Sequence, residues 1–208
     1  QTDRQTAVSS VQWLKLGSVA NITRGASPRP ISKYITENKN GINWIKIGDV
    51  PIGSKYVEAT SEKITYEGAK LSRFVKEGDF ILSNSMSFGR PYIMKTSGCI
   101  HDGWLSISGF EEFFIPDFLY HILSSSFIQK NMAQKASAGT VQNLNADIVR
   151  ELELPVPPLT EQARIVSILD RFDALCNDLT SGLPAEIEER KKQYEYYRDK
   201  LLTFKEAV

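Results

Sequence analysis

The feature that most constrains the fold is a change of pattern near residue 152. The proline-rich segment LELPVPP covers residues 152–158. It cannot be helical throughout, because a proline lacks the backbone N–H donor and clashes with the preceding helical turn. Thr160 then supplies a candidate helix N-cap, and Glu161 places a negative charge in the first turn. The sequence therefore predicts an extended segment that ends where a long helix begins.

Apolar residues after this point recur at the spacing of a coiled coil. Steps of three and four residues separate them, as expected for the a and d positions of a heptad. They are Ile165, Ile168, Phe172, Leu175 and Leu179. Ser181 and Gly182 are predicted to end this helix, and a second apolar seam follows. That seam contains Ile187, Tyr194, Tyr197, Leu201 and Phe204.

Two arrangements of these helices remain open, because a lone helix of about 20 residues leaves its apolar seam in water. In one arrangement, the two helices fold back on each other or on the N-terminal part of the chain. In the other, which we favour, they pair with a second pair of helices. The second arrangement predicts a homodimer formed through the C-terminal helices.

The N-terminal part has a different pattern, with short apolar runs broken by Gly, Pro, Asn and Ser. Strands are predicted at residues 44–47, 80–82 and 105–107, and a helix over residues 116–133. The chain of 208 residues is long enough to bury a sizeable core. We therefore predict the α+β class, with a mixed-sheet domain over residues 1–154 and long coiled-coil-like helices over residues 155–208.

Charge and targeting signals favour a cytoplasmic protein that contacts nucleic acid. Residues 1–150 contain 17 Lys and Arg against 13 Asp and Glu, whereas residues 151–208 contain 8 against 12. A weakly basic body suits a nucleic-acid partner. Cys99 and Cys176 lie far apart, which fits reduced thiols. Neither a signal-peptide layout nor a membrane-spanning apolar run is present, so we expect no membrane partner.

Catalytic chemistry is not predicted. The nearest constellation contains Cys99, His101, Asp102 and His121. It lacks zinc-site spacing, and the adjacency of Asp102 to His101 does not orient an imidazole base. The sequence also lacks a phosphate-binding GxxxxGK[ST] loop, a glycine-rich cofactor fingerprint and the motif of amino-methyltransferases. We expect no metal and no cofactor on this chain.

Three loops carry the side-chain types that read DNA, since arginine, asparagine and glutamine present forks to base edges while serine, threonine and lysine contact phosphates. The first loop (residues 23–34) offers Arg24, Ser27, Arg29 and Lys33. The second loop (residues 83–92) offers Asn84, Ser85, Ser87 and Arg90. The third loop (residues 137–145) offers Thr140, Gln142 and Asn143. The alternatives are a solvated basic loop, an ordinary polar turn and, for Asn145, a helix cap. Three tryptophans, Trp13, Trp44 and Trp104, are expected in the core.

Several stretches together resemble the specificity subunit of type I restriction-modification systems. The most specific is PPLTEQARIVSILD at residues 157–170, with a P-x-x-E-Q-x-x-I core formed by Pro158, Glu161, Gln162 and Ile165. The tail at residues 183–204 is similar to a conserved helix of one branch of that family. WLKLGSVANITRG, KEGDFILSNSMSFGRP and SAGTVQNLN resemble the opening, an internal turn and a late loop of its recognition domain.

The resemblance implies a non-catalytic module that reads one half of an interrupted site in double-stranded DNA. Its helices would set the distance to the other half and dock methyltransferase subunits, with the restriction subunit joining through the complex. S-adenosylmethionine, ATP and Mg²⁺ would be bound by those partners. Family members typically have two recognition domains and two helical regions, whereas this chain has one of each, so we expect a half-subunit or a fragment. The alternative function is a helical adaptor whose N-terminal domain binds a protein or peptide.

Overall fold

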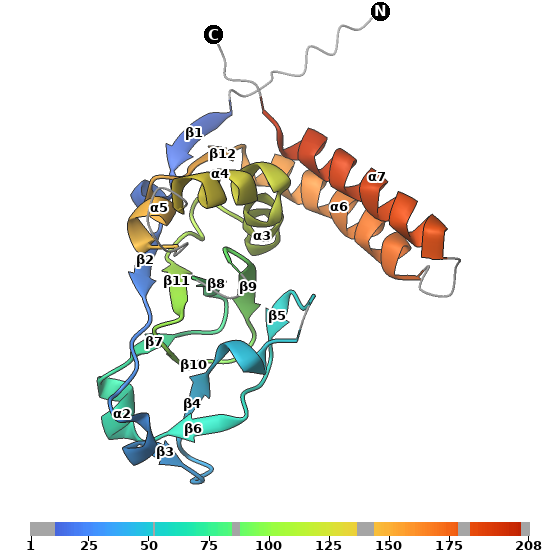
Figure 1. The fold of residues 1–208 in the computed structure, drawn as a ribbon. Coiled ribbons are helices and arrows are strands. Elements are labelled where there is room, and N and C mark those ends of the chain that lie inside the picture. Colours follow the sequence, from blue (N-terminus) through green and yellow to red (C-terminus); the bar gives the residue numbers. More distant parts are fainter. Residues whose placement is uncertain (1–10, 52, 85–87, 137–143, 179–183, 205–208) are drawn as a thin grey trace, which may run out of the picture.

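Two five-stranded sheets form the framework of the N-terminal part (Figure 1). The computed structural model describes residues 11–51, 53–84, 88–136, 144–178 and 184–204, with only the backbone for 173–178 and 184–187. One sheet has the order β2-β11-β8-β9-β5. Its strands are Asn21–Arg24, Trp104–Ser108, Phe80–Ser83, Pro91–Met94 and Tyr56–Val57. Only β5 and β9 run parallel in this sheet.

The second sheet has the order β3-β6-β4-β10-β7 and carries a parallel pair, β4 and β10, among antiparallel ones. Its strands are Ile35–Thr36, Glu62–Ile64, Ile42–Ile45, Gly98–Ile100 and Arg73–Val75. Short helical turns connect the strands. They are α1 (Leu16–Val19), η1 (Ile31–Lys33), η2 (Ile47–Asp49) and α2 (Tyr66–Lys70). Both sheets are mixed, as predicted.

Helices α3 (Pro116–Ser124), α4 (Ser126–Ala136) and α5 (Ala146–Arg150) pack against the first sheet. The prediction of one helix over residues 116–133 is wrong, because Ser125 adopts an extended conformation between α3 and α4. Its hydroxyl accepts a hydrogen bond from the Ile128 N–H at 3.4 Å, which starts the second helix. The apolar pattern crosses this break because Ile122 and Ile128 both face the same core.

The strand predictions at residues 80–82 and 105–107 are confirmed, whereas the one at 44–47 is displaced to Ile42–Ile45. Asp49 accepts the Lys46 N–H at 2.9 Å and turns the chain into η2. Trp44 and Trp104 are 3% and 1% exposed, which confirms them as core residues. Trp13 is only partly buried, because its strand belongs to a separate two-stranded sheet of β1 (Gln12–Lys15) and β12 (Glu153–Val156).

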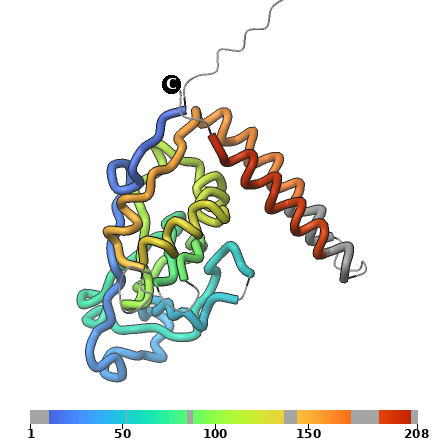
Figure 2. The backbone as a smooth tube through the Cα atoms, turned by 45° about the horizontal axis from the view of Figure 1, so that its top comes forward, coloured from blue at the N-terminus to red at the C-terminus, as the bar shows by residue number. Residues whose placement is uncertain are grey.

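The two C-terminal helices, α6 (Leu159–Asp178) and α7 (Pro184–Leu202), lie side by side as an antiparallel hairpin (Figures 1 and 2). The rings of Phe172 and Tyr197 stack between them, with centroids 5.7 Å apart. Of the two arrangements left open by the sequence, packing within the chain is therefore present. Within the described ranges, no helix is both long and apolar enough to cross a membrane.

The predicted seams need correction where the hairpin meets the body. Ile165 and Leu169 are fully buried in the core of the first sheet and its helices, whereas Ile168 is only partly buried. Leu202 is likewise buried, while the predicted Leu201, Tyr194 and Phe204 only pack at the edge of that core. The reason is that α6 contacts both α3 and α7, which widens its apolar face beyond an a/d stripe. Leu175, Leu179 and Ile187 lie outside the described side chains.

The joint between body and hairpin is built on Gln162. Its side chain is fully buried and donates from Nε2 to the carbonyls of Phe113 at 2.8 Å and Pro157 at 2.9 Å. Its Oε1 accepts the Ile115 N–H at 2.9 Å. The boundary predicted between residues 154 and 155 falls inside β12. The division of the chain at that point stays a prediction.

Candidate DNA-recognition surface

The first loop is fixed by close backbone packing where it leaves β2. Gly25 donates its N–H to the Trp104 carbonyl at 2.9 Å, and Ala26 donates to the Ile100 carbonyl at 3.2 Å. A Cβ atom at position 25 would lie 2.0 Å from the His101 carbonyl oxygen, so only glycine fits there. The loop is thereby held against residues 101–103, the turn that joins β10 to β11.

Asp102 in this turn contacts several residues of the first loop. Ser27 Oγ donates to Asp102 Oδ1 at 2.8 Å, and Arg29 Nη2 lies 3.4 Å from Asp102 Oδ2. Arg24 Nε donates to the Asp102 main-chain carbonyl at 3.1 Å. The hydrogen bond from Ser27 lowers the pKa of Asp102, so this carboxylate is charged at neutral pH. Three of the four predicted first-loop residues are thus joined to one acidic side chain or its backbone.

The second loop reaches the same turn, and Leu144 beyond the third loop's undescribed part contacts the second loop. Asn84 Nδ2 donates to the Asp102 carbonyl at 2.8 Å, and the Asn84 N–H donates to the Gly103 carbonyl at 3.1 Å. Leu144, near the end of the third loop, donates its N–H to the Asn84 carbonyl at 2.9 Å. Segments far apart in sequence are therefore anchored within a few residues of each other.

The residues predicted to contact DNA differ in how far their side chains are exposed to solvent. Arg24, Arg29, Lys33 and Arg90 are exposed. Ser27 is partly buried, and Asn84 is 3% exposed with its amide committed to the turn, so its side chain holds the loop and does not face solvent. Asn145 Oδ1 accepts the Ile148 N–H at 2.9 Å and caps α5, as the alternative for this residue predicted. The remaining predicted contacts lie outside the described residues: Ser85, Ser87, Thr140, Gln142 and Asn143.

Asp102 is not among the contact residues predicted for this surface. From the sequence it stood out only as a neighbour of His101, in the constellation rejected for catalysis. A signal was nevertheless present, because HDG at residues 101–103 is a turn sequence between two apolar strands. Its hydrogen bonds to the first loop join residues 73 to 78 positions apart in the sequence, which no local pattern encodes.

The residues of the rejected catalytic constellation take part in packing and hydrogen bonding within the fold. Cys99 is buried in β10, and burial raises the pKa of its thiol. His101 Nδ1 accepts the Gly103 N–H at 2.7 Å, and burial lowers the pKa of its imidazole. His121 Nε2 lies 3.3 Å from Asp170 Oδ1, linking α3 to α6. Among the described residues, no group of three or more His, Cys, Asp or Glu could hold a metal ion.

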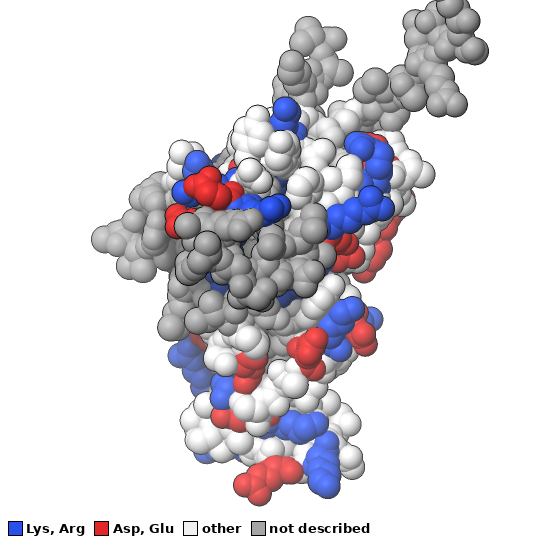
Figure 3. Space-filling model, turned by 90° about the vertical axis from the view of Figure 1, so that its right-hand side faces the viewer, with Lys and Arg blue, Asp and Glu red and all other residues white. Residues whose placement is uncertain are grey.

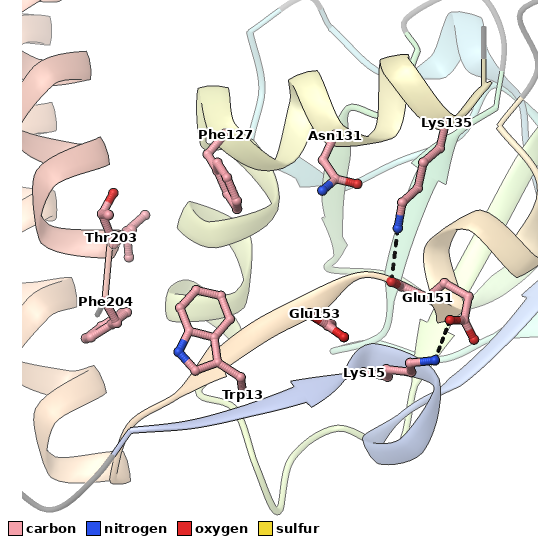
Figure 4. A pocket seen from close by; sticks show the side chains of 10 residues that line it. Trp13, Lys15, Phe127, Asn131, Lys135, Glu151, Glu153, Thr203 and Phe204 are labelled. Atoms are coloured by element: carbon pink, nitrogen blue, oxygen red, sulfur yellow. Dashed lines mark hydrogen bonds and ion pairs between the residues drawn. The ribbon is translucent and has the colours of Figure 1, made fainter. Parts of the chain in front are cut away.

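A separate pocket of about 590 Å³ lies where β1, α4, β12 and the end of α7 meet (Figure 4). Trp13, Phe127 and Phe204 supply aromatic walls, and Phe127 is 59% exposed. Within the described part of the chain, the buried atoms Trp13 Nε1 and Asn131 Oδ1 have no hydrogen-bond partner. Both atoms are closed off from solvent, so the surface that the pocket presents to a ligand comes mainly from its aromatic side chains and its charged rim.

Two of the charged side chains at the rim of this pocket form an ion pair, and a third donates a hydrogen bond to the backbone. Lys15 Nζ pairs with Glu151 Oε2 at 2.6 Å, and Lys135 Nζ donates to the Glu151 carbonyl at 3.2 Å. On the face shown in Figure 3, Lys and Arg side chains lie among Asp and Glu side chains. Interspersed signs are typical of a solvated surface and do not mark a phosphate track.

Comparisons with known proteins agree with the resemblance seen in the sequence. The family model described as the type I restriction modification DNA specificity domain matches residues 9–189. The chain is 31% identical over 198 residues to the type I restriction enzyme EcoR124I/EcoR124II specificity subunit of Escherichia coli, covering 93% of this chain and 48% of that protein. It is 35% identical over 176 residues to the putative specificity subunit S.HindORF215P of Haemophilus influenzae, covering 84% and 44%.

Solved structures give the same answer for the fold. The HsdS subunit from Thermoanaerobacter tengcongensis superposes with a TM-score of 0.66 at 19% identity, covering 97% of this chain and 47% of that one. A chain from a study of complex assembly in the type I R-M system gives 0.68 at 20% identity, covering 96% and 48%. The predicted α+β class is confirmed, and the chain spans about half the length of the relatives it matches. By sequence and fold together, this chain belongs to the family of type I restriction modification DNA specificity domains.

Proposed function

We propose that this chain reads one half of an interrupted site in double-stranded DNA, as the specificity subunit or half-subunit of a type I restriction-modification complex. The observation that supports the proposal is that the first and second loops both form hydrogen bonds with Asp102, beside which Arg24 and Arg29 are exposed. Arginine is the side chain that most often reads guanine, through two parallel hydrogen bonds to O6 and N7. Arg90 and Lys33 are exposed as well and would supply further base or phosphate contacts.

The α6–α7 hairpin is proposed to act as a spacer and a docking element. Methyltransferase subunits would bind there, and a restriction subunit would join through the complex. The chain itself would catalyse nothing, so S-adenosylmethionine, ATP and Mg²⁺ would belong to those partners. We place the complex in the cytoplasm, where its DNA substrate is found.

The pocket in Figure 4 supports the proposal that the chain also binds a protein partner. Its aromatic lining, with Phe127 59% exposed, suits an apolar side chain of a polypeptide segment, since aromatic anchors are enriched at protein interfaces. We propose a methyltransferase subunit as this partner. Phe127→Ala should weaken its capture by at least about fivefold if an aromatic anchor is lost, whereas Phe74→Ala, at a similarly exposed site on β7, should not. Equal capture by both variants would remove the pocket from the interface.

The DNA-reading function is tested by reconstituting the chain with methyltransferase subunits and measuring modification across a library of duplexes. One short half-site motif should emerge, shared by all modified sequences. Sequence-independent modification would overturn the proposal. Binding that ignores both the sequence and the salt concentration would instead favour the adaptor function, since phosphate contacts are strongly salt-dependent.

A further inference from the structure

We propose that Asp102 is a specificity-determining positioning residue, which holds the first loop in its reading geometry and weakens binding to DNA of the wrong sequence. This inference rests on the proposed DNA-reading function. It concerns a residue that touches the side chains proposed to contact bases and need not touch a base itself.

Both carboxylate oxygens of Asp102 are engaged by the first loop. Oδ1 accepts from Ser27 and Oδ2 faces Arg29, while the Asp102 N–H donates back to Ser27 Oγ at 3.3 Å. Ser27 and Asp102 are therefore joined by two hydrogen bonds that form a small closed ring. The Asp102 side chain is 43% exposed and that of Arg29 is 83% exposed. The carboxylate thus lies at the surface, beside the arginine that is proposed to contact DNA.

The turn that carries Asp102 is itself held by a hydrogen bond and by the burial of the residue that follows it. His101 and Gly103 are linked by a hydrogen bond of 2.7 Å, and the next residue, Trp104, is 1% exposed and donates from its indole to the Ile45 carbonyl at 3.2 Å. A side chain on such a platform can fix its neighbours in place. Side chains fixed before binding lose less conformational entropy when they meet DNA, which favours a precise contact.

The charge of Asp102 acts differently on phosphates and on base edges. A phosphate carries a full negative charge and is repelled by the carboxylate, so Asp102 subtracts from the attraction that Arg24 and Arg29 exert on any duplex. A guanine edge offers neutral acceptors, and an arginine can bind it while keeping its contact with a carboxylate. Asp102 therefore penalises sequence-independent binding more than sequence-specific binding, which is how repulsive elements create specificity.

Asp102→Asn in the reconstituted complex tests this inference, because asparagine keeps an oxygen acceptor for Ser27 but removes the charge. The affinity is measured for a duplex with the motif found in the modification experiment and for an unrelated duplex of equal length, at several salt concentrations. The ratio of the two affinities should fall by about fivefold or more, mainly through tighter binding of the unrelated duplex. The salt dependence of that binding should also steepen. Glu58→Gln, an exposed site with the same change of charge, should leave the ratio unchanged.

Asp102→Ala provides the second variant, since it removes both the charge and the acceptors. It should lower the affinity ratio as well and also weaken binding of the motif. If both variants weaken the two duplexes by one common factor, Asp102 only supports the fold and the inference is wrong. If the wild-type complex already binds both duplexes equally, the DNA-reading function itself has failed. A specific wild type with an unchanged ratio in Asp102→Asn would reject the inference alone.

Discussion

At the scale of single residues, Gln162 stabilises the joint between the body and the hairpin, because its side-chain amide forms hydrogen bonds with three backbone groups. Gln162→Ala leaves a buried donor and buried carbonyls without partners, which costs about 1–3 kcal/mol for each group not rescued by water. We expect the free energy of unfolding to fall by about 2–4 kcal/mol, measured by urea denaturation. Gln193→Ala on the exposed surface of α7 is the control and should change it by less than about 0.5 kcal/mol. Equal stability of both variants would show that the joint does not depend on this side chain.

The loop arginines belong to the same scale but affect DNA and not folding. Arg29→Ala and Arg90→Ala remove exposed side chains, so the unfolding free energy should change by less than about 0.5 kcal/mol. Loss of a bidentate base contact should lower the binding free energy by about 1–3 kcal/mol. Affinity of the reconstituted complex for its site is the measurement, with Arg171→Ala on α6 as the control. Full affinity and unchanged site choice in both variants would exclude these arginines as readers.

His101 makes the turn sensitive to acid. Burial lowers the pKa of its imidazole despite the nearby Asp102, so the unfolded chain takes up the proton at a higher pH than the folded chain does. Stability from His101 is therefore fully present above its ordinary pKa of 6.5 and is lost as the pH falls below that value. Protonation of Nδ1 also removes the acceptor of the Gly103 N–H. Urea denaturation at pH 7.5 and 5.5 should show a smaller loss of stability in His101→Asn than in the wild type. Identical losses would contradict the assignment.

At the scale of elements, two adjacent leucines of α7 are expected to have different roles, one in packing of the core and one in association with other subunits. Leu202 is 8% exposed within the body's core, whereas Leu201 lies at the edge of that core. Leu202→Asp should destabilise the whole chain by about 2–5 kcal/mol, because it buries a charge and removes apolar volume. Leu201→Asp should mainly weaken association of the helices with other subunits. Melting and analytical ultracentrifugation distinguish the two. A loss of cooperative melting in Leu201→Asp would assign that residue to the core as well.

The hairpin is also tied to the body through one polar contact from each of its two helices. Ser126 on α4 donates to Asp199 on α7, and His121 on α3 lies against Asp170 on α6. Together with the stacked Phe172 and Tyr197, these contacts fix the direction in which the hairpin leaves the body. A spacer must hold such a direction if it is to set the distance between two half-sites.

At the scale of the whole molecule, the proposed function assigns one half-site to the recognition domain described here, so reading the other half-site requires a second domain. We expect two copies to pair through their C-terminal helices with two-fold symmetry when no other recognition domain is present. A helix of 19 residues such as α7 spans about 28 Å at 1.5 Å per residue, close to the roughly 34 Å of one DNA turn. The target should then be an interrupted palindrome. A strictly monomeric chain at micromolar concentration, or an asymmetric site modified with this as the sole specificity chain, would contradict the expectation.

The sequence by itself determined the change from a sheet-rich part to a helical tail, because proline geometry and apolar periodicity are local properties. It also determined the family, through a motif whose buried Gln162 explains why an amide is needed there. The tertiary structure decided which face of α6 is covered, since Leu169 and not Ile168 meets the core once α3 and α7 pack on the same helix. It alone brought Ser27, Asn84 and Asp102 together. Those contacts join segments that are far apart along the chain, and strand pairing sets them, whereas a local pattern reports only on neighbours in sequence.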